Sequence, residues 1–325
     1  MEAGKKEIIT IIRYTNESKD LWDNFVAESR NGTFLFARDY MEYHRDRFCD
    51  YSLMFAKNGE ITALLPAHIS GTDLCSHCGL TYGGLVLSNK TTAKDVLNIF
   101  EQLFDYLRKH TNIETLLYRP TPHIYHKYPC EEDLYAMFRF NANLTERKIS
   151  SVVWQRQPQP FYGRRKLTTA CKSRMHIVED SNFAAFWELL ELRLREKYAA
   201  QPVHTLSEIT QLHSYFPGNI KLIRVTDNDG NTLAGVVIYL TSTVAHAQYT
   251  ATSNEGRRIG ALDYLYEYLL HEKFADIEYF DFGTSVEDGG KILNTGLISQ
   301  KEGFGSRAIV YDTYTIEIKK EDKND

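Results

Sequence analysis

The expected helices and strands in the second half of the sequence follow the same order as those in the first half. In each half a hairpin with a glycine in its turn is followed by a strand, an amphipathic helix and another strand. The corresponding segments are residues 59–65 and 230–237, 80–82 and 247–249, 92–110 and 258–272, and 113–118 and 277–282. Self-similarity on this scale indicates two copies of one α/β unit. A cleft is expected where two such copies meet, and clefts hold ligands.

The length of 325 residues corresponds to ~2 domains. We predict domains at residues 1–157 and 158–325, with a proline-containing linker over residues 155–159. The apolar fraction of 43% and the charged fraction of 25% are those of an ordinary globular protein. Each half is therefore long enough to bury a core of its own.

The net charge of −5 provides no overall basic field to attract nucleic acid or anionic lipid. A local basic patch is formed by Arg164, Arg165 and Lys166, for which a solvated helix face is the simpler interpretation. No segment is long and apolar enough to cross a bilayer, and residues 1–7 lack a signal-peptide core. We therefore predict a cytoplasmic location and, at residues 319–325, a frayed polar tail.

Five local expectations bear on the site. Residues 81–87 are predicted to be a strand that contains Gly83 and Gly84, and residues 162–172 a basic helix. Residues 258–273 are predicted to be one helix, and residues 308–318 to close the sheet of the second half. Residues 119–129 contain three prolines, which exclude a helix interior or a central strand.

The cysteines are odd in number and irregularly spaced, which argues against a disulfide framework; they are Cys49, Cys75, Cys78, Cys130 and Cys171. Cys75 and Cys78 have the spacing of half a zinc site. No second pair follows, whereas closed zinc sites need four ligands. The sequence therefore predicts no metal site and two thiols beside a strand.

Ionisable residues lie at the ends of two strands of the second half. Asp281 follows an apolar strand, where ligands of open α/β sheets bind, and is either a base or a structural carboxylate that bonds the next loop. Strand alternation puts His246 and Gln248 on one face and Tyr249 on the other. His246 is a candidate proton carrier, or else a satisfied core histidine.

Residues 291–305 form the densest polar stretch beside a core strand. Lys301 lies close to two glycines and can present an ammonium to a developing oxyanion. The alternative is a surface pair between Lys301 and Glu302, which would contribute little.

Together these residues resemble the second domain of Fem-type (FemAB-like) transferases, a branch of the GNAT-like acyltransferases. The matching pieces are residues 234–237, His246-x-Gln248-Tyr249-x-Ala251, residues 257–262, Asp281-Phe282-Gly283 and Lys301-x-x-Phe304-Gly305. The first half resembles the degenerate N-terminal copy, including residues 81–84. The resemblance implies an α/β fold of two tandem GNAT-like domains with mixed sheets and an inter-domain cleft.

The resemblance also implies acyl transfer from an activated carboxyl donor, with Lys301 stabilising the tetrahedral intermediate. Acyl-CoA would be a donor substrate rather than a tightly bound cofactor. Its pyrophosphate would be held by residues of the [R/Q]-x-x-G-x-[G/A] motif, which here are Arg257, Arg258, Gly260 and Ala261. Leu262 stands at the last place of that motif, where the family has Gly or Ala. The heptads of the coiled-coil arm that some Fem enzymes carry for tRNA are absent.

Three functions remain open from the sequence. The first is an acyltransferase that modifies an amine or hydroxyl of a sugar or peptide precursor of the cell envelope, with Lys301, Asp281 and His246 as catalytic residues. The second uses aminoacyl-tRNA as donor, as Fem-type enzymes do, and the third is a non-catalytic binder of a glycan precursor. The predicted substrate-binding residues are Tyr82, Gly83, Arg119, His123, Tyr125, Gln248, Tyr249 and Asn294.

Overall fold

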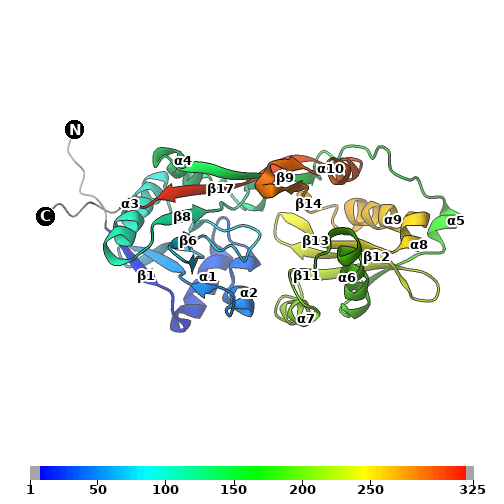
Figure 1. Ribbon diagram of the computed structural model, residues 1–325, viewed down its shortest axis with the longest axis horizontal. Helices are drawn as coiled ribbons and strands as arrows, with labels where there is room; N and C mark the ends of the chain where they lie inside the picture. Colours follow the sequence, from blue (N-terminus) through cyan, green and yellow to red (C-terminus); the bar gives the residue numbers. More distant parts are fainter. Residues whose placement is uncertain (1–7, 320–325) are drawn as a thin grey trace. The chain divides into compact units, whose positions relative to one another are not determined.

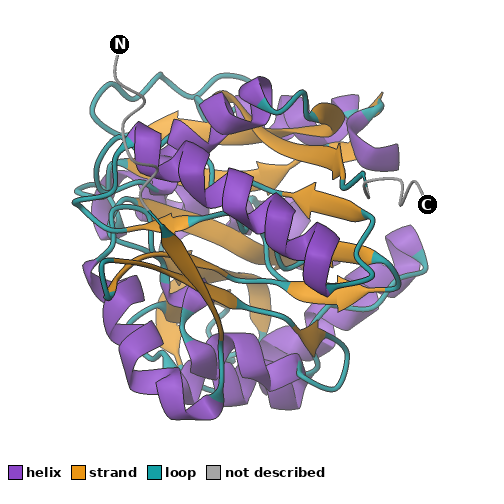
Figure 2. Cartoon of the chain, turned by 90° about the vertical axis from the view of Figure 1, so that its left-hand side faces the viewer, coloured by secondary structure: helices purple, strands orange, loops and turns teal. Residues whose placement is uncertain are grey.

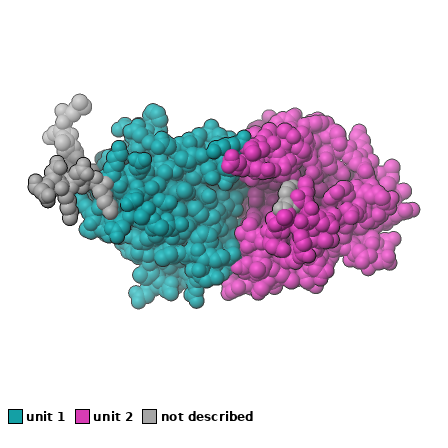
Figure 3. Space-filling view, in the orientation of Figure 1, with its two compact units in different colours: residues 1–148, 289–291, 310–325 teal, residues 149–288, 292–309 magenta. Residues whose placement is uncertain are grey.

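The computed structural model describes residues 8–319, which form two compact units (Figures 1 and 3). Unit 1 contains residues 8–148, 289–291 and 310–319, and unit 2 contains residues 149–288 and 292–309. The chain therefore enters and leaves each unit more than once, and the predicted division at residue 157 stays a prediction. Residues 1–7 and 320–325, on which the expectations of no signal peptide and of a frayed tail rest, lie outside the described residues.

Unit 1 contains a sheet of strand order β1-β3-β4-β7 and a second group of order β17-β8-β6-β5-β2. The strands of the first sheet are β1 (Ile9–Arg13), β3 (Leu53–Lys57), β4 (Glu60–Leu65) and β7 (Val86–Leu87). Those of the second group are β17 (Arg307–Glu317), β8 (Thr115–Tyr118), β6 (Asp73–Cys75), β5 (His68–Ser70) and β2 (Cys49–Asp50). The helices are α1 (Lys19–Glu28), α2 (Arg38–Met41), α3 (Ala93–His110) and α4 (Glu132–Arg139).

Helix α3 covers the strands of unit 1, as Figure 2 shows from the left-hand side of Figure 1. It begins with a capping box, in which Thr92 and Asp95 each bond the backbone of the other. Its apolar stripe, predicted from the 3.6-residue period, is buried in the core of the unit through Val96, Ile99, Leu103 and Leu107.

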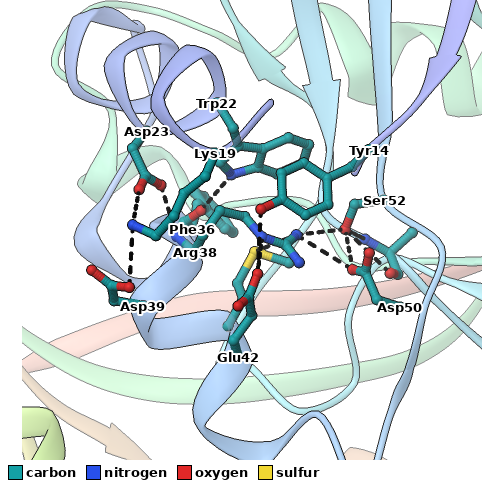
Figure 4. A network of polar contacts seen from close by, with 12 residues as sticks. Tyr14, Lys19, Trp22, Asp23, Phe36, Arg38, Asp39, Glu42, Asp50 and Ser52 are labelled. Atoms are coloured by element: carbon teal, nitrogen blue, oxygen red, sulfur yellow. Dashed lines mark hydrogen bonds and ion pairs between the residues drawn. The ribbon is translucent and has the colours of Figure 1, made fainter. Parts of the chain in front are cut away.

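A buried arginine attaches helix α2 to the strands (Figure 4). Arg38 is 2% exposed, and its guanidinium lies 3.6 Å from the ring centroid of Tyr14. It donates to Glu42 at 3.0 Å, to Ser52 at 3.2 Å and to Asp50 at 3.4 Å. These contacts satisfy a charge that would otherwise be costly to bury.

Unit 2 is built on a sheet of order β10-β11-β12-β13-β14-β9. The strands are β10 (His176–Asp180), β11 (Ile220–Thr226), β12 (Thr232–Leu240), β13 (Val244–Thr252), β14 (Tyr279–Thr284) and β9 (Asn143–Trp154), whose last residues belong to this unit. Only β13 and β14 pair in parallel; the other neighbours are antiparallel. The helices are α5 (Thr169–Lys172), α6 (Ala184–Tyr198), α7 (Leu206–Tyr215), α8 (Asn254–Ile259), α9 (Ala261–Tyr268) and α10 (Thr295–Glu302), and a small hairpin joins β15 (Val286–Glu287) to β16 (Ile292–Leu293).

The order predicted from the repeat is present in both units. Each has an antiparallel hairpin, β3-β4 or β11-β12, and a following strand, β7 or β13, pairs with the second strand of that hairpin. A helix and a further strand come next along the chain. The mixed α/β fold class is therefore confirmed. None of the helices within residues 8–319 combines the length and apolarity needed to cross a bilayer.

Three predicted elements are wrong in extent. Residues 81–87 form a strand only at Val86–Leu87, since Gly84 has a φ of +82°, outside the strand region. The helix predicted over 162–172 is reduced to α5, because the preceding residues are held by tertiary contacts of Arg164 and Arg165. The helix predicted over 258–273 divides at Gly260, whose φ is also +82°.

The last strand of the chain is correctly located, but only its residues 307–309 belong to unit 2. We expected residues 308–318 to close the sheet of the second half; β17 does follow β9 in the strand order, but it is not an edge strand, because it also pairs with β8, with Tyr314 opposite Tyr118. In unit 2 the strand beside β14 is β9, with Val152 opposite Asp281. Alternating apolar residues predict a strand but not its partner, which explains the error.

Candidate functional site

Strands β13 and β14 of unit 2 pair for only a short distance and then separate. Their parallel register runs from Val244 opposite Tyr279 to His246 opposite Asp281. Beyond that point β13 continues beside β12 as far as Thr252, and no further pairing between β13 and β14 is found in the described residues. The separation leaves one edge of β13 available at the carboxyl ends of two parallel strands, where ligands of α/β sheets bind.

A β-bulge lies just beyond the paired residues. Val237 is opposite Tyr249, whereas the next residue, Ile238, is opposite Ala247, so Gln248 is the extra residue of β13. The alternation of side chains between the two faces of the strand is therefore interrupted at Gln248. We had used this alternation to place His246 and Gln248 on the same face. The Oε1 atom of Gln248 is buried and has no hydrogen-bond partner in the described structure.

Asp281 is the buried centre of a hydrogen-bonded group. It is 0% exposed and accepts from Ser150 Oγ at 2.6 Å and from the Gly283 backbone N–H at 2.8 Å, both through Oδ1. Its Oδ2 lies 3.0 Å from Nδ1 of His246. Several donors around one carboxylate stabilise its ionised form. An ionised Asp281 holds the proton of His246 on Nδ1, which leaves Nε2 as the basic nitrogen.

Lys301 lies near this group on α10, whose first turn is capped by the side chain of Asn294. The Nζ atom of Lys301 donates to the carbonyl oxygens of Gly283 and Thr284, each at 2.8 Å. Burial lowers the pKa of Lys301 to about 8, and the negative charge of Asp281 opposes that shift. Since an ammonium has three N–H donors, two carbonyl bonds leave one N–H to direct elsewhere. Lys301 forms no surface pair with Glu302 among the described ion pairs.

A pocket of about 810 Å³ lies within unit 2 beside these residues. Lys301 and Gln300 of α10 line it, together with Phe282 of β14. His246 and Asp281 do not line it, although their chain neighbours Ala247 and Phe282 do. Other lining residues come from α6, α8, α9 and the free edge of β13, among them Arg193, Arg257, Gln248, Thr250, Thr252 and Tyr266. The volume suits a small-molecule ligand.

The residues predicted to bind a pyrophosphate have different surroundings. Arg257 is exposed, and both it and Gly260 line the pocket. Arg258 is paired with Glu255 at 2.6 Å and is not among the lining residues, and Ala261 is buried in the core of the unit. Their role in donor binding stays a prediction.

The predicted basic patch is partly used to hold this region together. Arg164 pairs with Asp263 of α9 at 2.7 Å and lies 4.3 Å from the ring centroid of Phe304. Arg165 bonds the carbonyl oxygen of Arg258, and its side chain packs against Gly260. The segment before α5 therefore covers the turn between α8 and α9.

Tyr249 is directed away from the Asp281 group. It is 9% exposed, packs against Trp187 and shares a short hydrogen bond of 2.5 Å with Nδ1 of His204. Burial raises its pKa to about 12. Asn294 caps α10 and also donates to Glu287 at 3.1 Å, so it supports the helix that carries Lys301.

The substrate-binding residues predicted in the first half lie in unit 1. Tyr82 and Tyr125 are buried with ring centroids 4.4 Å apart, and His123 is exposed. The backbone N–H of Gly83 bonds the carbonyl oxygen of Arg119 at 2.9 Å. The proposal that these residues bind the acceptor stays a prediction.

Sequence reasoning missed Ser150 and Arg193. Ser150 lies on β9 and bonds Asp281 across the sheet, a pairing that no local pattern encodes. Arg193 of α6 donates to the Thr252 carbonyl at 2.9 Å where it lines the pocket. Arg193 is one of several charged residues of α6, so the sequence alone does not distinguish it.

One family model matches part of the chain. Residues 162–288 match the family model described as an acetyltransferase (GNAT) domain. The matched segment contains β13, the α8–α9 turn and Asp281. No curated protein matches the sequence.

Solved structures share the fold across most of the chain. The crystal structure of FemX covers 93% of this chain and 96% of its own, with a TM-score of 0.62 and 12% identity. The C-terminal domain of a putative lysylphosphatidylglycerol synthetase from Agrobacterium fabrum covers 92% and 91%, with a TM-score of 0.55 and 11% identity. A conserved protein of unknown function from Bacteroides thetaiotaomicron covers 96% and 100%, with a TM-score of 0.53 and 11% identity.

Proposed function

We propose that this chain, whose residues 162–288 match a GNAT acetyltransferase domain and whose fold is similar to that of FemX, is an acyltransferase that transfers an acyl group from acyl-CoA to an amine. The acceptor amine belongs to a sugar or peptide precursor of the cell envelope. The observation that carries the proposal is the desolvated ammonium of Lys301, which lines the pocket where β13 and β14 separate.

The reaction requires charge stabilisation at the acyl carbon. The amine attacks the thioester carbonyl, a C–N bond forms, and the carbonyl oxygen becomes an oxyanion. The remaining N–H of Lys301 bonds this oxygen, and such a donor contributes on the order of 3–4 kcal/mol when the site excludes water. The intermediate then expels the thiolate of CoA, which breaks the C–S bond.

The proton of the attacking amine also needs an acceptor. His246 is suited to this step because Asp281 fixes Nδ1 as the protonated nitrogen and leaves Nε2 basic. Because His246 does not itself line the pocket, the proton passes from the amine to Nε2 through a water molecule, and then to the departing thiolate. Asp281 remains ionised throughout, held by Ser150 and Gly283.

The free edge of β13 supports an extended thioester donor. Residues 247, 248 and 250–252 line the pocket from the side of β13 that β14 has left. Backbone N–H and C=O groups on such an edge can bond the amide groups of a pantetheine arm. Arg257 at the pocket rim offers a cation to the pyrophosphate.

Aminoacyl-tRNA is the second candidate donor. The side chain of Arg165 packs on Gly260, and Leu262 stands where the motif has a small residue, so less backbone is accessible to a pyrophosphate. The Fem-type resemblance implies this donor. With either donor, the reaction would take place in the cytoplasm, where both compounds are made.

Donor binding to the full chain distinguishes the candidates. We expect acetyl-CoA at 100 times its Kd to raise the apparent stability by ~2.7 kcal/mol. Arg257→Ala should weaken binding, whereas Arg258→Ala, which alters a neighbouring arginine outside the pocket lining, should not. Binding of aminoacyl-tRNA that falls steeply with salt, without a response to acetyl-CoA, would favour the second donor. If the chain binds neither compound, both donors are excluded.

A further inference from the structure

Three metal-ligating side chains gather in unit 1, whereas His246, Asp281 and Lys301 belong to unit 2. One ligand atom from each of His68, Cys75 and Cys78 lies within 4.8 Å of the others. In the sequence, Cys75 and Cys78 have the spacing of half a zinc site. The structure adds His68, which lies seven residues before Cys75 and was not connected with it.

The fold explains why these residues meet. His68 on β5 is directly opposite Cys75 on β6 in an antiparallel pair. A tight turn brings Cys78 back towards Cys75. In this turn the His77 N–H bonds the Cys75 carbonyl oxygen at 2.7 Å, and His77 has a φ of +51°. The Ser76 N–H is fixed to the carbonyl of Leu117 at 2.9 Å. Two strands and a turn therefore hold the three side chains in place.

His68 provides an independent indication of a ligand. His68 is only 3% exposed, and its Nδ1 atom has no hydrogen-bond partner within the described residues. The rings of Phe48 and His77 pack against it, with centroids 4.8 Å and 5.3 Å away. A buried nitrogen without a partner is costly, and coordination to a metal ion would remove that cost.

The donor set selects the kind of ion. Two thiolates and an imidazole are preferred by Zn²⁺ over the hard cations Mg²⁺ and Ca²⁺. Two thiolates would neutralise the charge of the ion.

We propose that unit 1 binds one Zn²⁺ through His68, Cys75 and Cys78, with a water molecule at the fourth tetrahedral position. Binding releases the two thiol protons to solvent and involves no redox change. The ion joins the β5–β6 hairpin to the turn that leads into residues 79–85. None of the three ligands is among the residues assigned to acyl transfer, so the proposal does not rest on that reaction.

The test is metal binding by the full chain, reduced with a phosphine and stripped by a chelator. Zinc titration against a chromogenic competitor should give one Zn²⁺ per chain. Co²⁺ should bind at the same site and produce a thiolate-to-metal charge-transfer band together with the strong visible bands of tetrahedral cobalt. His68→Asn and Cys78→Ser should each weaken zinc binding by more than about 100-fold, beyond what losing an outer-shell partner causes.

Cys171→Ser is the matched control, because Cys171 is exposed and lies in unit 2. It should retain one Zn²⁺ per chain and the cobalt spectrum. If a ligand variant fails to fold, the cobalt spectrum of the unaltered chain decides by itself. The proposal is overturned if the reduced, folded chain takes up no zinc and shows no charge-transfer band. It is also overturned if Cys75 and Cys78 form a disulfide that zinc does not prevent.

Discussion

Lys301 donates from Nζ to the carbonyl oxygen of Gly283 at 2.8 Å, so the cation of the pocket is positioned by a backbone group of β14. Gly283 also provides the N–H that bonds Asp281 at 2.8 Å. A methyl group on Gly283 would lie 3.5 Å from Cε1 of His246. One glycine therefore bonds both Asp281 and Lys301 and leaves only enough space for a methyl group before His246.

Replacing this glycine should disturb both stability and activity. Gly283 has a φ of +77°, and an L-residue there costs roughly 1–2 kcal/mol. We expect Gly283→Ala to lower the free energy of unfolding by that amount in urea denaturation. Gly296→Ala on α10 is the control, because its nearest neighbour would be 3.9 Å away and its φ is not positive. Equal effects of the two changes would contradict this reading of β14.

The desolvation of Lys301 predicts a pH-dependent stability. Its folded pKa of about 8 lies below the ordinary value of 10.5, so the unfolded chain binds more protons between these pH values. The cost of burying the ammonium is present in full below pH 8 and disappears as the pH rises through this window. The unaltered chain should therefore gain stability relative to Lys301→Met as the pH increases.

Denaturation of both proteins in urea at several pH values measures this difference. Lys291→Met is the control, since Lys291 is exposed and its ammonium is solvated in both states. Its stability difference from the unaltered chain should stay constant. A constant difference for Lys301→Met as well would mean that Lys301 is not desolvated.

Two neighbouring serines of β9 test the Asp281 group. Ser150→Ala removes the 2.6 Å hydrogen bond to a fully buried carboxylate and should cost about 1.5–3 kcal/mol. Ser151 is equally buried, but its Oγ has no partner in the described residues, so Ser151→Ala should be neutral or stabilising. Chemical denaturation compares them. The reverse order would show that Ser150 does not stabilise Asp281.

Substitution of Arg38 tests how much its buried contacts contribute to the stability of unit 1. Arg38→Met leaves Glu42 and Asp50 without their buried cation, and it should lower the free energy of unfolding by roughly 3 kcal/mol. This value is at the lower end for a broken buried ion pair because both carboxylates are partly exposed. Arg13→Met removes an exposed arginine that stacks on Tyr51 and should cost about 1 kcal/mol or less. Thermal unfolding followed by circular dichroism measures both. A similar loss for both would contradict the assigned role of Arg38.

The sequence predicts local elements well where the pattern is repeated over many residues. The apolar stripe of α3 and the hairpins of both units follow from periodicity and turn residues, and the structure confirms them. Strand partners cannot be predicted in the same way, because the alternation of a strand does not identify its neighbours. The pairing of β17 with β8 could therefore not be predicted from residues 307–317 alone.

The same limit applies to the candidate sites. Asp281 was identified because it lies at a strand end, His246 because it is a histidine on a strand, and Lys301 because of the family resemblance. The structure brings all three together around Gly283. Ser150 was missed because its contact depends on sheet register. His68 was missed for the same reason, since only the hairpin register places it opposite Cys75.

Acyl turnover of Lys301→Met tests the central claim most directly. Thiol release from acetyl-CoA in the presence of amine acceptors should show a kcat lower by about 10²–10³-fold, the effect of removing one oxyanion donor. Acetyl-CoA should still bind to the variant, and Lys291→Met should turn over like the unaltered chain. If Lys301→Met retains full turnover, Lys301 does not stabilise the transition state and the proposed mechanism is wrong.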